Sequence, residues 1–541
     1  MAPVNPQTTI GLSQGCCYDC RCYLDLEDSL TQVAYETFDI FKGISHLGLE
    51  VPKAQIATPT DIVDHLVLTT DRKAFETLSL PLNVLTQSLK LKNVIKLPPS
   101  TVSFKVSPEE SHKLNGDYPP SYLAPDFPRP IHPAKIIDAR ELTRAGAQKR
   151  VYHISMDVSD YPLAEGDEWL VGGAIGISAR NSLKVVDEIL RCLDISDEEA
   201  DEPIIVKTTG GRWPTLWAED QPRELPTSRR ELLAWTIDVQ SFPPKKALLR
   251  LMAEYTSDPV QKKILLFLCS TQGQPSFCHL RTTGQITLIH LLHAFPSSRP
   301  PLDHLFSILP PLNARFYSLS NDPSKSSPTG QRILDFAFTV QESHDTWRDE
   351  VRAGVGTGFL EQRCQKWISS SSFEREMITI PMFRGLHKNA LALEYKAEGP
   401  IVLIGAGVGI APFRGFVQRR LQNAACSGQV YVIQGCRDCH VDEIYCGEWG
   451  GDYSARTIVE SRRGRKEYVQ DEIRRQGKTI WRVLNKENGA IYACGSGKGM
   501  AQDIMDALVD VGIEHGRLTP DESRKTWTEW NGVRLHMENW G

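Results

Sequence analysis

Residues 401–420, IVLIGAGVGIAPFRGFVQRR, constrain the fold of this chain more than any other stretch. Four apolar residues open the stretch and are typical of a buried strand. Gly405, Gly407 and Gly409 follow, and then Ala-Pro-Phe begins a helical run. A glycine turn leading into a helix start favours anion binding, because glycines let backbone N–H groups approach a phosphate and the helix adds a positive dipole. The spacing fits neither GxGxxG nor a P-loop, so the stretch alone is equally compatible with a plain tight turn.

The segment GAGVGIAPF within this stretch resembles the pyridine-nucleotide loop of the ferredoxin–NADP reductase superfamily, which usually reads Gly-x-Gly-Thr-Gly-[Ile/Val]-Ala-Pro-[Phe/Tyr]. The resemblance implies that Gly405, Gly407 and Gly409 bind NADPH. Val408 stands where the family has threonine, so a hydroxyl donor near the pyrophosphate or nicotinamide is missing.

Length and composition exclude several classes of protein. A chain of 541 residues is long enough for about three domains. Its net charge of −6 argues against a general nucleic-acid binder. No apolar run approaches the ~20 residues of a membrane-spanning helix. The first residues lack the basic and apolar parts of a secretory signal, so the thirteen cysteines suggest reduced thiols and a cytoplasmic protein.

The first region, residues 1–125, carries a cluster of four thiols at Cys16, Cys17, Cys20 and Cys22. Thiols this close could bind zinc or an iron–sulfur centre, but their spacing matches no standard ligand pattern. Reduced thiols in a short turn are the simpler interpretation, and we therefore predict no metal site. No loop in this region resembles the phosphate loop of a flavodoxin.

The second region, residues 126–395, combines strand and helix patterns. Alternating apolar residues at 151–156 and glycine corners near 172–176 predict strands of an antiparallel barrel. Apolar residues at helical spacing predict helices in an insert at about 180–300, with a Thr/Ser cap signal at 227–228. Residues 284–320 resemble the connecting helical subdomain and following strand of the diflavin reductases.

The tetrapeptide at 315–318, Arg-Phe-Tyr-Ser, forms a second motif. On a strand, Arg315 and Tyr317 share one face and Ser318 lies on the other. An arginine can pair with a phosphate and an aromatic ring can cover a flat heterocycle. Arg-x-Tyr-Ser is also the flavin signature of the superfamily. That resemblance assigns Arg315 to the FAD pyrophosphate, Tyr317 to the isoalloxazine face and Ser318 to the flavin N5 edge.

A third motif, GVGTGFL, begins at Gly354 about 40 residues later. A glycine-rich hairpin loop is the plain alternative. The motif resembles the family's Gly-Val-x-[Ser/Thr]-x-[Trp/Phe]-Leu and follows in the family's order. The resemblance implies that Gly354, Val355 and Thr357 hold the FAD diphosphate at a helix start.

The third region, residues 396–541, alternates strands with helices, which predicts a parallel, doubly wound sheet. Strands are expected at 401–407, 430–436 and 490–496. Arg437 follows the second strand, at the carboxyl end where such sheets bind ligands. Further along the chain, residues 462–466 contain four basic residues, which on composition alone are a solvated charge run. It resembles the family's 2′-phosphate motif, which implies NADPH in preference to NADH and assigns binding to Ser461, Arg462, Lys466, Tyr468 and Gln470.

The last motifs lie near the end of the chain. Tyr492-Ala493-Cys494-Gly495 resembles the family's Tyr-x-Cys-Gly, whose cysteine lies beside the nicotinamide C4 and flavin N5. Ser496 departs from the aspartate that the family commonly has. The ending resembles that of the diflavin reductases and implies that Trp540 stacks on the flavin while Glu538 tunes proton and hydride transfer near Ser318 and Cys494. A buried thiol and an exposed tryptophan are the plain alternatives.

Together these motifs predict the FAD/NADPH reductase module of a diflavin reductase without its flavodoxin-like FMN domain. The expected fold is an α+β flavin barrel with a helical insert, followed by an α/β Rossmann-like NADPH domain. The expected activity is hydride transfer from NADPH to FAD, with electrons passing to a separate flavodoxin-like, haem or other redox protein. A flavin-binding scaffold with little turnover, or a metal-centre electron-transfer protein that uses the N-terminal cysteines, are the alternatives.

Overall fold

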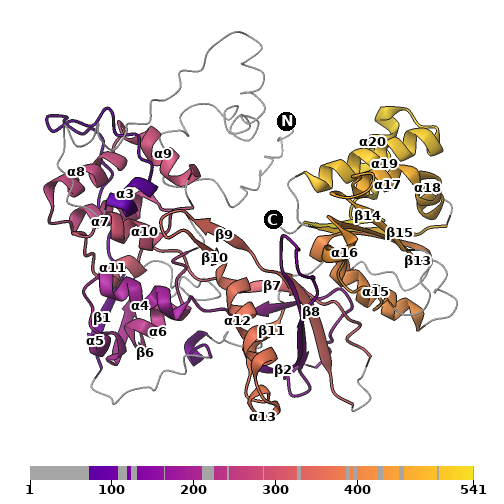
Figure 1. Ribbon diagram of the computed structural model, residues 1–541, viewed down its shortest axis with the longest axis horizontal. Helices are drawn as coiled ribbons and strands as arrows, with labels where there is room; N and C mark the ends of the chain where they lie inside the picture. Colours follow the sequence, from indigo (N-terminus) through magenta and orange to yellow (C-terminus); the bar gives the residue numbers. More distant parts are fainter. Residues whose placement is uncertain are drawn as a thin grey trace, which may run out of the picture. The chain divides into compact units, whose positions relative to one another are not determined.

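The computed structural model describes fourteen ranges of the chain (Figure 1). They are 72–107, 118–123, 131–163, 165–209, 224–240, 243–283, 285–325, 330–385, 390–393, 399–422, 430–449, 456–485, 487–495 and 499–539. Several residues singled out in the sequence lie outside these ranges: Cys16, Cys17, Cys20, Cys22, Ser496 and Trp540. Their predicted roles stay predictions.

The chain divides into two compact units. One unit comprises Met1–Phe104, Glu188–Asp197 and Phe242–Leu309, and the other comprises Lys105–Asp187, Glu198–Ser241 and Pro310–Gly541. Three elements run across a boundary between them: β1 (Val102–Val106), α4 (Leu183–Cys192) and α5 (Asp197–Asp201).

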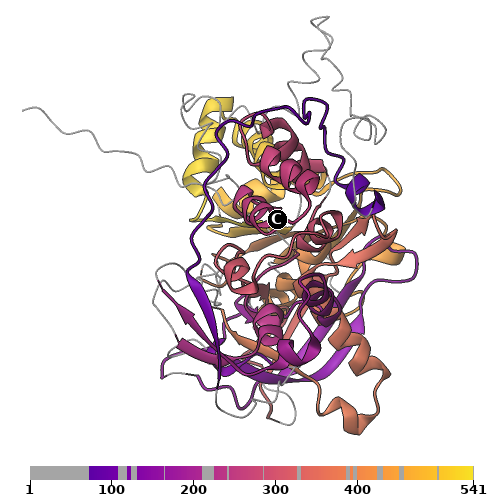
Figure 2. The same cartoon turned by 90° about the vertical axis from the view of Figure 1, so that its left-hand side faces the viewer.

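Short helices make up most of the regular structure described in the first unit, and Figures 1 and 2 show them gathered in one bundle. Its helices are α3 (Arg72–Thr77), α7 (Lys246–Glu254), α8 (Pro259–Leu268), α9 (Gln274–Thr283), α10 (Leu288–Ala294) and α11 (Leu302–Phe306). Phe75 of α3 packs edge-on against Phe295 at 5.8 Å, and Ile95 N–H donates to the Cys269 carbonyl at 3.3 Å. The described N-terminal residues therefore pack with the predicted helical insert.

The second unit begins with a six-stranded antiparallel sheet in the order β7-β4-β11-β2-β3-β8. Its strands are β2 (His132–Glu141), β3 (Val151–Asp157), β4 (Ala174–Ile177), β7 (Arg315–Ser318), β8 (Ile333–Thr339) and β11 (Thr379–Arg384). An antiparallel bridge joins Leu319, directly after β7, to Phe336 of β8, so the sheet closes into the predicted barrel. The barrel interior holds buried side chains such as Ile154, Ile175 and Met382.

Further helices and strands accompany this barrel. They are η3 (Ser121–Leu123), β5 (Ile204–Thr208), β6 (Glu224–Thr227), α6 (Arg229–Trp235), β9 (Glu342–Asp345), β10 (Glu350–Ala353), α12 (Val355–Ser369) and α13 (Ser372–Arg375). The cap signal at 227–228 is confirmed at α6, where the Ser228 side chain accepts the Glu231 N–H.

A five-stranded parallel sheet follows in the order β14-β13-β12-β15-β16. Its strands are β12 (Ile401–Ala406), β13 (Val430–Cys436), β14 (Arg456–Glu460), β15 (Ala490–Gly495) and β16 (Leu535–Asn539). Three of them were predicted. The strands β14 and β16 were not, since each is short and offers only two apolar residues.

Helices cover both faces of this sheet, as Figure 1 shows with α15 on one side and α17 to α20 on the other. Ile401 and Leu403 pack with Phe413 of α15, whereas Val402 and Ile404 pack in the cluster on the opposite face. The helical elements are α14 (Ala390–Leu393), η4 (Gly407–Ile410), α15 (Ala411–Leu421), α16 (Cys439–Asp442), α17 (Val469–Arg475), α18 (Gly477–Asn485), α19 (Met500–Gly516) and α20 (Pro520–Trp530).

The predicted fold class is confirmed as an antiparallel barrel with helices followed by a doubly wound parallel sheet. None of the helices in the described ranges is both long and apolar enough to cross a membrane.

Candidate active site

Strand β7 brings the Arg-x-Tyr-Ser motif against the start of α12. A Cβ atom added to Gly356, in the first turn of α12, would lie 2.7 Å from Arg315 Cγ and 3.4 Å from Tyr317 Oη. Arg315 and Tyr317 therefore lie on the same face of β7 and both approach this turn. Two motifs that the sequence separates by about 40 residues meet here, and only glycine leaves room for the contact.

Arg315 is held by a buried carboxylate that the sequence did not single out. Its Nη2 lies 3.3 Å from Asp238 Oδ2, and the Asp238 side chain is fully buried. Asp238 is itself fixed, because its N–H donates to the Pro310 carbonyl at 2.9 Å. Arg315 also donates from Nη1 to the Asn313 carbonyl. With its side chain 30% exposed, Arg315 can still present its guanidinium to a phosphate.

Tyr317 lies at the edge of the barrel core. Its ring centroid is 5.3 Å from that of Phe336 and 6.2 Å from that of Phe338. Burial raises the pKa of the Tyr317 phenol, so the ring stays neutral. A fixed, uncharged ring of this kind suits the predicted contact with the flat face of a flavin.

The first turn of α12 is built to accept an anion. Gly354 precedes the helix and donates its N–H to the Gln341 carbonyl at 2.8 Å, while Thr357 Oγ1 accepts the Gln341 N–H at 3.1 Å. The Thr357 hydroxyl hydrogen can still donate outward. Together with the free N–H groups at the start of a 15-residue helix, these donors fit the diphosphate of FAD.

The glycines of the nucleotide loop have different roles. A Cβ on Gly405 would lie 2.6 Å from Ile410 Cα, and one on Gly409 would lie 2.4 Å from the Cys494 carbonyl oxygen. These two glycines therefore allow close backbone packing. Gly407 has a φ of +57° and nothing within 4 Å of an added Cβ, so it faces open space.

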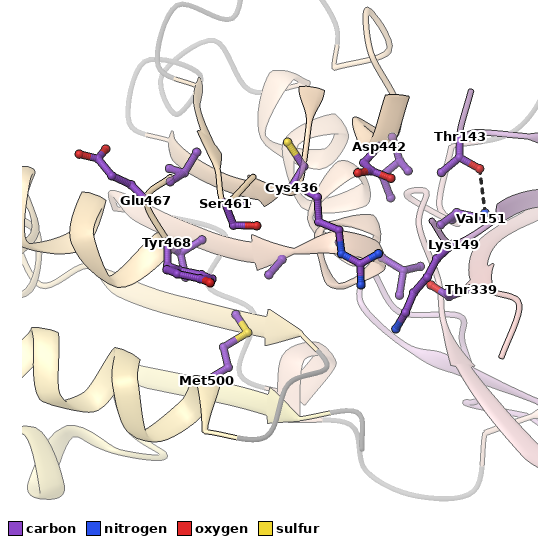
Figure 3. A pocket seen from close by; sticks show the side chains of 18 of the residues that line it. Thr143, Lys149, Val151, Thr339, Cys436, Asp442, Ser461, Glu467, Tyr468 and Met500 are labelled. Carbon is purple, nitrogen blue, oxygen red and sulfur yellow. Dashed lines mark hydrogen bonds between the residues drawn. The ribbon is translucent and has the colours of Figure 1, made fainter. Parts of the chain in front are cut away.

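That open space is a cavity of about 330 Å³. Among the residues predicted to bind NADPH, it is lined by Gly407, Arg437, Ser461, Tyr468 and Gln470. Figure 3 shows Ser461, Tyr468 and Met500 around the cavity, with Lys149 and Thr143 of the barrel at its other side. The predicted residues offer a phosphorylated ligand a guanidinium, two hydroxyls and a glycine backbone, and three carboxylates, Asp442, Glu467 and Asp503, also line the cavity.

The predicted 2′-phosphate motif forms a turn beside this cavity. The Ser461 N–H donates to the Cys436 carbonyl at 3.0 Å, and the Arg462 N–H donates to the Arg437 carbonyl at 2.9 Å. Arg462 and Lys466 are exposed at the turn and do not line the cavity itself. Within the described ranges their side chains form no hydrogen bond or ion pair, so both cations are available to a ligand.

The barrel and the parallel sheet meet at Ser318, Cys494 and Glu538. Ser318 Oγ lies 3.5 Å from Glu538 Oε2, and Glu538 is the register partner of Cys494 across β15 and β16. Burial, followed by the charge of Glu538, raises the pKa of the Cys494 thiol well above its ordinary value. The structure thus brings together three of the four residues predicted to be catalytic.

A buried polar network joins the two domains beside this point. Tyr445 Oη lies 3.0 Å from His153 Nδ1 and donates to Ser320 Oγ at 3.0 Å. Arg414 stacks over the Tyr445 ring at 4.8 Å and pairs with Asp335 at 3.0 Å. Burial lowers the pKa of His153 to about 4, so its ring is neutral at pH 7. Sequence reasoning missed this network, because its residues come from five separate segments and no local pattern shows that they meet.

Comparison with known proteins agrees with this geometry. The FAD binding domain model matches residues 124–359, and the oxidoreductase NAD-binding domain model matches residues 403–506. An uncharacterized FAD-binding protein from Schizosaccharomyces pombe is 44% identical over 497 residues, which cover 84% of this chain and 85% of the relative. A second such protein from the same organism is 42% identical over 523 residues, which cover 92% and 89%.

Human methionine synthase reductase is also similar, with 31% identity over 421 residues. The match covers 71% of this chain but 58% of that reductase, so the chain spans little more than half of its length. The matched domains make this chain an NADPH-dependent oxidoreductase that uses FAD. The chain belongs to the family of FAD-binding oxidoreductases that share the FAD and NADPH domains of the diflavin reductases.

Proposed function

We propose that this protein oxidises NADPH and delivers the electrons to a separate redox protein, either flavodoxin-like or haem-containing. The observation that carries the proposal is the meeting of Ser318, Cys494 and Glu538 where the flavin barrel adjoins the nucleotide sheet. Bound at such a site, FAD would supply the acceptor for the NADPH hydride and the capacity to pass electrons on singly or in pairs.

The residues of the chain bind and orient the two cofactors. Arg315, fixed by Asp238, and the start of α12 would bind the FAD diphosphate, while Tyr317 would cover the flavin ring. Arg437, Ser461 and the exposed turn residues Arg462 and Lys466 would bind the phosphates of NADPH. Because the barrel and the parallel sheet would hold the two ligands next to each other, hydride transfer would take place between groups that are already oriented.

The central residues control protons and water. Ser318 is 5% exposed and Cys494 is 1% exposed, so both residues are shielded from solvent. The Cys494 thiol stays protonated, because burial and Glu538 raise its pKa. A neutral thiol adds no negative charge beside Glu538. The Glu538 carboxylate can accept a proton from the Ser318 hydroxyl or return it.

A separate acceptor is proposed because no loop within residues 1–125 resembles the phosphate loop of a flavodoxin. One observation supports the alternative that the protein is a flavin-binding scaffold with little turnover. Val408, which replaces the threonine of the family, lines the nucleotide cavity and supplies no hydroxyl there.

Dye reduction by the flavin-loaded protein tests the proposal. We expect NADPH oxidation with ferricyanide as acceptor, and we expect Cys494→Ala and Glu538→Gln to lower kcat at least tenfold while the flavin stays bound. Cys278→Ala, in the helical unit, is the matched control and should leave kcat unchanged. A flavin-loaded wild-type protein that reduces no dye with NADPH supports the scaffold alternative instead.

A further inference from the structure

Three side chains that can bind transition metals follow one another shortly after β13: Asp438, Cys439 and His440. One carboxylate oxygen, the thiol sulfur and one imidazole nitrogen all lie within 4.8 Å of one another. In the part of the chain that the structure describes, no other group of three His, Cys, Asp or Glu side chains gathers its ligand atoms in this way. None of the three residues lines the nucleotide cavity, so the cluster is separate from the site described above.

Hydrogen bonds fix the backbone that carries this cluster. Asp438 caps α16, since its Oδ1 accepts the His440 N–H at 2.9 Å. From the hairpin between β2 and β3, the Arg144 N–H donates to the Val441 carbonyl at 2.9 Å, and Arg144 Nη1 donates to the His440 carbonyl at 3.1 Å. The His440 imidazole itself is exposed and makes no hydrogen bond within the described ranges. The backbone is therefore ordered, whereas the imidazole can turn toward a metal ion.

A fourth ligand comes from the neighbouring strand. Glu460 ends β14 and is the register partner of Cys436 at the end of β13. Its Oε1 accepts the Cys439 N–H at 2.9 Å, and its carboxylate also accepts a hydrogen bond from the Cys439 thiol. A metal ion that takes the place of the thiol proton would therefore meet the sulfur and this carboxylate together.

The charges around the cluster leave room for a cation. Arg463 Nη1 lies 3.5 Å from Asp438 Oδ1, but the Arg463 side chain is 50% exposed, so this ion pair is weak. Glu460 forms no ion pair within the described ranges. The two carboxylates on either side of the Cys439 thiol thus share one exposed counter-ion, which a metal ion can displace.

This set of ligands selects zinc among the common metal ions. A thiolate and an imidazole favour zinc over magnesium and calcium, which prefer oxygen ligands, and carboxylates also occur in zinc sites. A tetrahedral zinc ion binds its ligands at about 2.0–2.3 Å, so the ligand atoms lie roughly 3.5 Å apart. Atoms that already lie within 4.8 Å of one another can reach this separation through small side-chain rotations.

We propose that Asp438, Cys439, His440 and Glu460 bind a structural zinc ion that joins the carboxyl ends of β13 and β14. The ion would lie beside the turn at 461–466, which carries the predicted 2′-phosphate ligands, and would stabilise this turn. Zinc binding at this place requires neither flavin nor nucleotide, so it is independent of the proposed function.

Zinc binding by the flavin-loaded protein tests the proposal. The protein is stripped with EDTA and dialysed against buffered free Zn²⁺, and the bound metal is measured by atomic absorption. We expect Cys439→Ala to hold one zinc ion per chain fewer than the wild-type protein, and we expect added zinc to raise the Tm of the wild-type protein more than that of this variant. Because Cys439 is half-buried, His440→Gln serves as a second variant at an exposed side chain, and it should weaken zinc affinity at least about tenfold.

Cys446→Ala is the matched control, since it removes an exposed thiol from the same segment and should keep the wild-type zinc content. Two results would overturn the inference. Equal zinc content and affinity in the wild-type protein, Cys439→Ala and His440→Gln would show that the cluster binds no zinc. Loss of zinc in Cys16→Ala/Cys20→Ala, with full zinc content in Cys439→Ala, would place the metal at the N-terminal cysteines instead. Both results are obtained without NADPH, so neither depends on the outcome of the dye-reduction assay.

Discussion

Arg315 in the barrel and Arg462 in the nucleotide domain are both assigned to cofactor phosphates, but their surroundings differ. Arg315 pairs with the fully buried Asp238 and is 30% exposed. Arg462 is exposed and has no side-chain partner within the described ranges. The flavin half of the site is therefore organised before its ligand binds, whereas the nucleotide half presents exposed cations in a turn beside the cavity.

This difference corresponds to the two roles of the ligands. A resident cofactor benefits from side chains that are already ordered, because less conformational entropy is lost on binding. A co-substrate that must leave after each turnover benefits from exposed contacts, which lose side-chain entropy on binding and hold it less tightly. Substitutions in the flavin half should therefore change stability and cofactor retention, whereas those in the nucleotide half should change only nucleotide affinity.

The largest effect is expected from Arg315→Leu. The change removes a phosphate ligand and leaves the buried Asp238 carboxylate unpaired, so FAD affinity should fall at least a hundredfold and the free energy of unfolding by about 3 kcal/mol. Flavin retention on gel filtration and urea unfolding measure the two quantities.

The double variant Arg315→Leu/Asp238→Leu separates these two causes. It should recover much of the unfolding free energy, since no buried charge remains, yet still fail to hold FAD. Full FAD binding by either variant would show that Arg315 contributes nothing to the flavin site.

The junction between the two halves should be sensitive to acid through His153. Burial lowers the pKa of His153 to about 4, below the ordinary value near 6.5, so the unfolded chain takes up a proton first as the pH falls. The contribution of neutral His153 to the free energy of unfolding is therefore complete above pH ~6.5. It is lost as the pH falls from about 6.5 to about 4, by about 3 kcal/mol in total.

Urea unfolding at pH 7 and pH 4.5 measures this loss. His153→Gln should show a smaller loss over that interval, while His344→Gln, at an exposed site, should match the wild-type protein. An identical pH dependence in His153→Gln would mean that the ring titrates normally in the folded protein.

For the nucleotide half, Arg462→Ala should raise the KM for NADPH by about ten- to a hundredfold, through the loss of a cation from the 2′-phosphate. The KM for NADH should stay unchanged, and so should the flavin content. Steady-state assays with ferricyanide as acceptor measure the KM for NADPH and the KM for NADH. Equal losses for both nucleotides would remove Arg462 from the 2′-phosphate site.

The smallest effect is expected from Val408→Thr. The two side chains are similar in volume, and Thr would add a hydroxyl to the cavity wall. NADPH should bind a few-fold more tightly if that hydroxyl meets the ligand, as one neutral hydrogen bond contributes about 1 kcal/mol. A calorimetric titration with NADP⁺ measures the change, and weaker binding would show that the valine packs against the ligand.

Local patterns were sufficient to predict much of this structure. The strand and glycine loop at 401–410, the Ser228 cap and the Arg-x-Tyr-Ser strand all depend on residues adjacent in sequence, and each forms as expected. The strand β16 was missed because parallel pairing to β15 is decided by the sheet and not by its own five residues.

The parts of the site that sequence could not supply are contacts between distant segments. Asp238 meets Arg315 across 77 residues, and nothing in its local sequence marks it as a phosphate-site residue. Tyr445 meets His153 across 292 residues. The Asp-Cys-His run at 438–440 is adjacent in sequence, but only the pairing of β13 with β14 brings Glu460 beside it.

The visible spectrum of the purified protein, before and after anaerobic NADPH, tests the central claim most directly, with the released flavin identified chromatographically. We predict a flavin spectrum that NADPH bleaches, and FAD without FMN in the released fraction. A colourless protein, or a bound flavin that NADPH fails to bleach, would contradict the assignment of this site to hydride transfer between NADPH and FAD.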